Sequence, residues 1–215
     1  YFALSEKAFA AFSAALDRTP RKNPRLRRLL RTSSPWERCV VAVKRDSGED
    51  SLLPPGPIAA SHELRDFESG EPTLDDWLRR RALRNEVSGG SRKYVVCTKT
   101  NHRVVAYYCL AAGAVEHAAA PGRVRRNMPE PGPVLVIGRL AVDRRFQGRG
   151  LGRALLRDAI LRTIQAADIA GIRAILVHAI SENARKFYEQ AGFHPSPIDP
   201  MTLMITVAEA EQALR

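Results

Sequence analysis

Several features of membrane, secreted and metal-binding proteins are missing from this 215-residue sequence. No run approaches the roughly 20 apolar residues of a membrane-spanning helix, and the N-terminal residues lack the basic-then-apolar order of a signal peptide. The three cysteines, Cys39, Cys97 and Cys109, are scattered and odd in number, which fits neither a disulfide framework nor paired zinc ligands. The five histidines are isolated, so no metal site is expected. These absences predict a cytoplasmic protein without a membrane partner.

Negative charge is comparatively scarce. Lys and Arg number 34 against 23 Asp and Glu, a formal net charge of +11, and 45% of the residues are hydrophobic, enough for a real core. A strongly basic protein attracts polyanions before any specific contact forms, which favours a nucleic-acid partner. Solubility alone is the alternative explanation for the excess of arginine.

The most informative stretch runs from Val134 to Ala154. An apolar run from Val134 to Val142 predicts a strand, which is followed by a turn containing three glycines and by a helix. Glycines allow a loop to bring backbone N–H groups against a ligand, and the N-terminus of a helix attracts anions. The sequence therefore predicts an anion-binding loop, while a tight turn without a ligand stays open. The lysine of a P-loop is absent.

The N-terminal region predicts two short amphipathic helices. Ser5 is a candidate cap for the first, whose apolar stripe is Phe9, Phe12 and Leu16, and Asn23 followed by Pro24 starts the second. Two such helices cannot bury their own apolar faces, so we expect them to dock on the rest of the chain. A flexible tail is the alternative, and the arginines of this segment are candidates for direct nucleic-acid binding.

The remaining chain alternates strands and helices, which predicts an α/β or α+β fold with a central mixed sheet flanked by helices. We expect a helical arm at residues 1–40, a polar and proline-rich linker at 41–57 and a domain at 58–215. The predicted elements are a strand at 58–64, a helix at 73–87 capped by Thr73, a hairpin of 93–98 with 104–114, a helix at 151–168, a strand at 172–179, a helix at 182–190 capped by Ser181, and final strands that include 201–207.

The segment Arg145-Phe146-Gln147-Gly148-Arg149-Gly150 resembles the Arg/Gln-x-x-Gly-x-Gly/Ala pyrophosphate loop of the GNAT family of N-acetyltransferases. This resemblance implies the GNAT fold and acetyl-coenzyme A (acetyl-CoA) as cofactor, held by the loop and by the strand before it. The cofactor-binding residues it implies are Leu140, Ala141, Val142, Arg145, Gln147, Gly148, Arg149, Gly150, Leu151, Gly152 and Asn183.

The stretch Ser181 to Phe193 contains a Phe-Tyr-x-x-x-Gly-Phe pattern that is similar to the second GNAT motif. The resemblance places Tyr188 near the thioester sulfur. Attack by an amine expels a thiolate of pKa near 8.5, and a phenol of pKa about 10 can protonate it, so we expect Tyr188 to be the general acid. An ordinary core tyrosine is the alternative. No carboxylate recommends itself as a base, which favours an amine of low pKa.

A narrower resemblance covers most of the chain. Ala59 to Leu64, Ser69 to Ala82, Gly138 to Asp143 and Pro195 to Met201 resemble TacT-type acetyltransferase toxins, and residues 2–38 are similar to the part of TacA-type antitoxins that follows their DNA-binding portion. The resemblance implies acetylation of the α-amino group of aminoacyl-tRNA, which blocks translation, and neutralisation by the segment at 1–36.

Further partners follow as expectations from this resemblance. The candidates for tRNA binding are basic residues, namely Arg80, Arg81, Arg84, Lys93, Arg123 and Arg125. We also expect a homodimer, and operator DNA as a partner through an antitoxin DNA-binding domain that is missing here. Two alternatives remain: a protein or small-amine N-acetyltransferase, and a nonenzymatic DNA-binding regulator.

Overall fold

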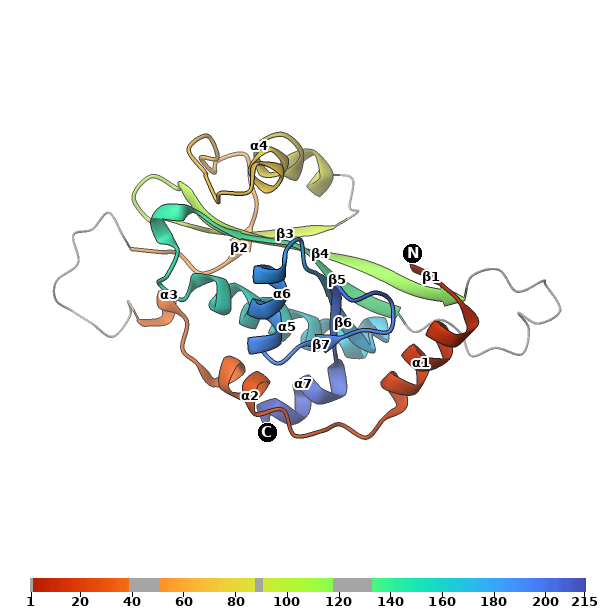
Figure 1. The fold of residues 1–215 in the computed structure, drawn as a ribbon. Coiled ribbons are helices and arrows are strands. Elements are labelled where there is room, and N and C mark those ends of the chain that lie inside the picture. The colour runs from red at the N-terminus through yellow and green to blue at the C-terminus, as the bar shows by residue number, and fades with distance from the viewer. Residues whose placement is uncertain (1, 39–50, 88–90, 118–132) are drawn as a thin grey trace. The chain divides into compact units, whose positions relative to one another are not determined.

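The computed structural model describes residues 2–38, 51–87, 91–117 and 133–215 (Figure 1). The chain forms two compact units. Unit 1 comprises Tyr1–Leu30, Ala112–Val136 and Ile160–Arg215, and unit 2 comprises Arg31–Ala111 and Ile137–Ala159. Strands β4 (Val104–His117) and β5 (Pro133–Val142) and helix α5 (Leu151–Ala170) contribute residues to both units.

Unit 2 contains strands in the order β2-β3-β4-β5, with β2 at Gly56–Pro57 and β3 at Arg92–Cys97. The pairs β2/β3 and β3/β4 are antiparallel, which confirms the predicted hairpin. Helix α4 (Pro72–Val87) places Trp77 and Leu78 in one buried cluster with Val95 and Tyr107. The helix predicted at 73–87 is therefore confirmed, and its apolar residues are buried.

Unit 1 continues the sheet in the order β4-β5-β6-β8-β7. Strands β6 (Ala174–His178) and β7 (His194–Pro195) both pair antiparallel with β8 (Thr202–Thr206). Helix α6 (Glu182–Gln190) begins at its predicted cap, where Ser181 Oγ accepts the Ala184 N–H at 3.2 Å. The expectation of a mixed sheet with flanking helices is confirmed.

The N-terminal arm, residues 2–38, forms β1 (Phe2–Leu4), α1 (Glu6–Asp17), α2 (Pro24–Arg31) and α3 (Pro35–Arg38). Strand β1 pairs in parallel with the end of β4, with Phe2 opposite Val115 (Figure 1). Ser5 caps α1 as predicted, and Asn23 Oδ1 accepts the Leu26 N–H at 3.0 Å as the predicted cap of α2. The arm is thus built into the fold and is not a flexible tail.

Some expected elements differ from the structure. Residues 58–64 form no strand apart from an isolated bridge from Glu63 to Arg103, because the paired residues lie just before them, at β2. Helix α4 begins at Pro72, so Thr73 lies inside its first turn. The final strand stops at Thr206, whose side chain caps an unexpected helix, α7 (Val207–Leu214).

The two compact units do not follow the expected boundaries of arm, linker and domain. Residues 1–30 of the arm belong to the same unit as the C-terminal residues. The last part of the expected linker is structured: Leu52 is buried and bridges to Thr98 ahead of β2. Residues 1–30 of the arm and the C-terminal part of the domain therefore share one hydrophobic core.

Candidate active site

The expected anion-binding loop, residues 147–152, lies between β5 and the first turn of α5, in which its last two residues take part, in unit 2. Asp143 caps a single 3-10 turn at Arg144–Phe146, and α5 then begins at Leu151. Gly148 and Gly150 have φ angles of 74° and 84°, which L side chains rarely adopt. A Cβ atom at either glycine would meet no atom within 4 Å, so backbone conformation and not crowding requires glycine at both positions.

Four loop amides are available to a ligand. Within the described part of the chain, the N–H groups of Gly148, Gly150, Leu151 and Gly152 donate no hydrogen bond. They precede or begin a helix of 20 residues, whose N-terminus carries a partial positive charge. This arrangement suits a phosphate group, and it fits the pyrophosphate of the coenzyme A that the sequence implies.

The side chains of Arg145 and Gln147 support the loop. Arg145 donates from Nε and Nη2 to the two carboxylate oxygens of Asp143, at 2.9 and 2.8 Å, and Gln147 Nε2 donates to the carbonyls of Ser69 and Val142, at 2.8 and 2.9 Å. Both residues were expected to bind the cofactor. Their side chains are engaged within the protein, so they leave the backbone amides as the loop's candidate anion ligands.

The buried carboxylate of Asp143 accepts the hydrogen bonds that hold Arg145 in place. Its burial would raise the pKa of its carboxyl, but hydrogen bonds from the Arg145 side chain and from the backbone N–H groups of Arg145 and Glu68 lower the pKa below the usual value. The hydrogen bonds that Asp143 accepts from the Arg145 side chain, together with its negative charge, also raise the pKa of Arg145. The loop is therefore anchored by a buried, ionised carboxylate.

Arg149 keeps a positive charge at the loop. Its side chain lies with the guanidinium carbon 4.9 Å from the centre of the Phe146 ring, and Phe146 is buried. The residue itself is exposed, so the expected contact with a cofactor phosphate is compatible with this placement. In β5, Ala141 is buried and Leu140 and Val142 are half-buried.

Tyr188 lies on α6, in unit 1. Its side chain is buried between Phe187 and Phe193, with ring centres 5.2 and 5.9 Å away. Burial raises the pKa of Tyr188 to about 12, so the phenol stays protonated at neutral pH. Among the described residues no group accepts a hydrogen bond from its hydroxyl, which leaves the proton available for donation.

Asn183 occupies the second position of α6, and it is exposed. The first turn of this helix is ordered by Ser181, whose side chain already satisfies one of the free N–H groups. The Asn183 side chain has no hydrogen-bond partner in the described part of the chain, which is compatible with the cofactor contact that the resemblance implies.

The expected tRNA-binding residues fall into three groups. Arg80, Arg81 and Arg84 are exposed on α4, where Arg84 donates to the Arg80 carbonyl at 2.9 Å. Lys93 is only 1% exposed, and its ammonium donates to the Ser91 carbonyl at 2.7 Å, which is at odds with a contact to a tRNA backbone. The Lys93 side chain is buried at this position of strand β3. Arg123 and Arg125 lie outside the described residues.

The arm contacts the end of the tyrosine helix, which sequence reasoning missed. Asn23 Nδ2 donates to the Gly192 carbonyl at 2.8 Å, and Arg25 donates to the Glu189 carbonyl at 3.3 Å. Gly192 has a φ of 102°, and a Cβ there would lie 2.7 Å from Asn23 Oδ1 and 2.8 Å from the Leu26 nitrogen. Because the arm approaches Gly192 this closely, the residue that follows the end of α6 must lack a side chain.

Two ion pairs hold the arm elsewhere. In unit 1, Asp17 at the end of α1 pairs with Arg173 at 2.6 Å. In unit 2, Glu37 of α3 pairs with Arg157 of α5 at 3.0 Å, beside the buried Ser34. In sequence these partners are 120 or more residues apart, so no local pattern could have indicated them.

The described residues contain neither a membrane-spanning helix nor a metal-binding cluster. No helix there is long and apolar enough to cross a membrane. No group of three or more His, Cys, Asp or Glu residues in those ranges is placed to hold a metal ion.

Two known protein families match this chain. Residues 58–193 match the model of the acetyltransferase (GNAT) family, and residues 1–34 match that of the antitoxin TacA 1-like family. The chain is 57% identical over 156 residues to a tRNA-acetylating toxin of Mycobacterium tuberculosis, which covers 73% of this chain and 93% of the relative.

Two solved structures are similar over 76% of this chain. One is a Tyr-to-Phe mutant of the toxin AtaT bound to the C-terminus of the antitoxin AtaR and acetyl-CoA, with a TM-score of 0.66, 28% identity and 98% of that chain covered. The other is AtaT complexed with acetyl-methionyl-tRNA, with a TM-score of 0.67, 28% identity and 99% covered. With its family model matched over residues 58–193, the chain belongs to the acetyltransferase (GNAT) family.

Proposed function

We propose that this protein transfers the acetyl group of acetyl-CoA to the α-amino group of aminoacyl-tRNA, and that its own N-terminal arm neutralises this toxin activity. The observation that carries the proposal is the docking of an antitoxin-like arm on the helix that bears Tyr188, in a chain whose loop presents free amides to a pyrophosphate. The tRNA-acetylating relative supports the acceptor.

The cofactor, when bound, supplies an activated acetyl thioester. The amides of Gly148, Gly150, Leu151 and Gly152 would hold its pyrophosphate, and Asn183 is a candidate for a further contact. Tyr188 would be the proton donor for the departing sulfur, and its burial among aromatic rings keeps its phenol protonated at neutral pH.

The acceptor must present a neutral amine. An α-amine has a pKa of roughly 8, and ester-linkage to tRNA lowers it further, so a useful neutral fraction exists at pH 7. A lysine side chain, with a pKa near 10.4, would need a strong base. Asp143 cannot act as that base, because its carboxylate is buried and held by Arg145.

The exposed arginines of α4 supply attraction for the phosphodiester backbone. Arg80, Arg81 and Arg84 form this basic face, and their charge adds to a chain of net charge +11. Binding of tRNA should therefore weaken steeply with salt. Acetylation of a protein or small amine would show little salt dependence.

The test measures acetyl transfer from labelled acetyl-CoA to a mixed pool of aminoacyl-tRNAs. Tyr188→Phe should lower kcat by about 10²- to 10⁴-fold, because it removes the proton donor and keeps the ring. Phe187→Tyr/Tyr188→Phe, which moves the hydroxyl to the neighbouring position, is the matched control and should not restore the rate. Equal transfer to deacylated tRNA or to a lysine peptide would contradict the proposed acceptor.

Two assembly states belong to the same proposal. We expect a homodimer, tested by light scattering, and binding of operator DNA when the arm is joined to an antitoxin DNA-binding domain. A monomer at micromolar concentration would remove the first expectation. Failure of such a joined chain to bind operator DNA would remove the second.

A further inference from the structure

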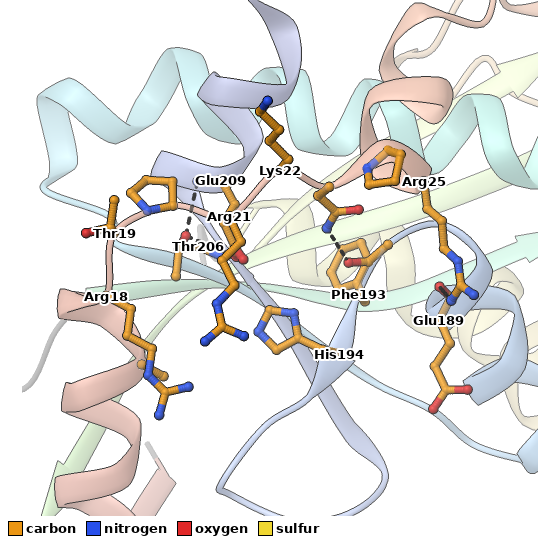
Figure 2. Close-up of a pocket in the computed structure, with 15 residues that line it drawn as sticks. Arg18, Thr19, Arg21, Lys22, Arg25, Glu189, Phe193, His194, Thr206 and Glu209 are labelled. Carbon is orange, nitrogen blue, oxygen red and sulfur yellow. Dashed lines mark hydrogen bonds between the residues drawn. The ribbon is translucent and has the colours of Figure 1, made fainter.

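A basic cavity lies within unit 1, between the arm and the C-terminal elements (Figure 2). Its volume is about 460 Å³. The segment between α1 and α2 forms one wall, and residues of α6, β7 and α7 form the other. The cavity is too large for a single small ion, and it is partly open to solvent.

The cavity contains more positive charge than its carboxylates can balance. Arg18, Arg21, Lys22 and Arg25 line it from the arm. Among the described residues, Arg18, Arg21 and Lys22 make neither a hydrogen bond nor an ion pair. Figure 2 shows Arg18 and Arg21 extending toward the side on which His194 lies.

The two carboxylates of the lining are already engaged. Glu189 accepts a hydrogen bond from Arg185 Nε at 3.1 Å. Glu209 accepts from the backbone N–H and the hydroxyl of Thr206, at 2.9 and 3.1 Å, in the capping box of α7. Neither carboxylate pairs with Arg18, Arg21 or Lys22, so the positive charge of the arm is left for an external anion.

Two helices also begin at this cavity. Asn23 and Pro24 start α2, and Thr206 caps α7, and all three residues line it. Helix N-termini carry partial positive charge, which adds to the field of the arginines without creating a site alone. The cationic side chains of the arm therefore face a wall that carries His194 and two carboxylates, both of which are already held by hydrogen bonds.

We propose that this cavity binds the phosphodiester backbone of a nucleic acid, and that the bound backbone bridges the arm and the acetyltransferase domain. Several cations around a half-open space of this size suit successive phosphates better than one compact anion. Because the ligand contacts both walls, it binds only the docked arm and stabilises docking in return. The site does not depend on which amine accepts the acetyl group.

The first test measures binding of a fluorescent single-stranded RNA by the full chain at several salt concentrations. Arg18→Gln/Arg21→Gln should weaken binding by on the order of tenfold and reduce the salt slope by about 1.4, because two cations are lost. The matched control is Lys7→Gln/Arg27→Gln, which removes the same charge from exposed arm positions outside the cavity. Equal weakening by both double variants would overturn the proposal.

The second test asks which phosphate compounds bind the cavity and whether binding needs both of its walls. If the cavity recognises a nucleic-acid backbone, duplex DNA and tRNA compete with the labelled RNA. Competition by pyrophosphate alone, at equal phosphate concentration, would show a site for small anions and overturn the proposal that a backbone bridges the two walls. Leu26→Asn removes no charge but undocks α2, so it should weaken RNA binding as well. Unchanged binding by this variant would contradict the bridging role. Arg18→Gln/Arg21→Gln changes exposed residues, so its folding is not in question.

Discussion

At the scale of single residues, the site relies on groups held in one protonation state. Tyr188 keeps its proton because its burial disfavours the phenolate. Asp143 stays ionised because hydrogen bonds from Arg145 and from two backbone N–H groups outweigh the effect of its burial. In the proposed mechanism, Tyr188 donates its proton and Asp143 holds the loop that would bind the pyrophosphate.

The pH dependence of catalysis follows from the raised pKa of Tyr188. With a pKa of about 12, the phenol remains protonated throughout the range in which a free tyrosine would lose its proton, near pH 10. We therefore expect kcat to show no fall due to tyrosine ionisation below pH 10. A profile of kcat between about pH 7 and pH 10 measures this. A descending limb that disappears in Tyr188→Phe would contradict it.

Loss of the Arg145 side chain should destabilise the protein. Arg145→Leu leaves the buried Asp143 carboxylate without its two side-chain hydrogen bonds, which should cost about 1–3 kcal/mol at pH 7. Urea unfolding measures this. Arg144→Leu is the control, since its ion pair with Glu68 is exposed and should contribute less than about 1 kcal/mol.

The pH dependence of that stabilisation has a definite sign. The pKa of Asp143 is lower in the folded state than in the unfolded chain, so the stabilisation is present above the unfolded value and is lost as pH falls through the lowered folded value. The difference between wild type and Arg145→Leu should therefore shrink in acid. A difference that is the same at pH 7 and at about pH 3 would contradict this account.

At the scale of elements, local sequence signals predicted where helices begin better than they predicted which strands pair. Ser5, Asn23 and Ser181 are caps that the sequence alone identifies, because capping depends on residues three apart. Strand β1 is too short to show alternation, and it exists because β4 offers it an edge more than a hundred residues later. The predicted strand at 201–207 includes Val207, the first residue of α7, since apolar residues continue across Thr206, and the helix itself is not predicted.

The candidate site was predictable to a similar extent. The glycine loop and the tyrosine pattern are contiguous motifs, so their positions could be read directly from the sequence. The inward orientation of Lys93 and the internal bonding of Arg145 and Gln147 could not, because each depends on residues that the fold brings from elsewhere. The contact of Asn23 with Gly192 spans 169 residues and has no sequence signature.

The cap of α2 should couple arm docking to activity. Asn23→Ala removes both the cap and the hydrogen bond to Gly192, which together stabilise the docked arm by about 2 kcal/mol. We expect acetyl transfer by the full chain to rise, measured as initial rate. Ser5→Ala removes a cap of the same arm that makes no contact with α6, and it should raise the rate much less. Equal rates in both variants would argue against this coupling.

At the scale of the whole chain, an antitoxin-like segment and an acetyltransferase share one polypeptide and one set of cores. Phe9 and Phe12 of α1 lie in the same buried cluster as Val134, Leu176 and Met204 of the sheet. Removing the arm would expose that cluster, so point variants that loosen only α2 test inhibition more cleanly than a deletion does.

The most direct measurement of the central claim compares acetyl transfer to aminoacyl-tRNA by three full-length proteins: wild type, Leu26→Asn, and Leu26→Asn/Tyr188→Phe. Leu26 is completely buried on α2, and placing an amide there should release the arm at a cost of at least about 2 kcal/mol. We predict a low rate for wild type, a rise on the order of tenfold or more for Leu26→Asn, and loss of that rise in the double variant. If wild type and Leu26→Asn acetylate aminoacyl-tRNA at the same rate while arm release is verified by hydrogen exchange, the arm does not neutralise the enzyme and the account is wrong.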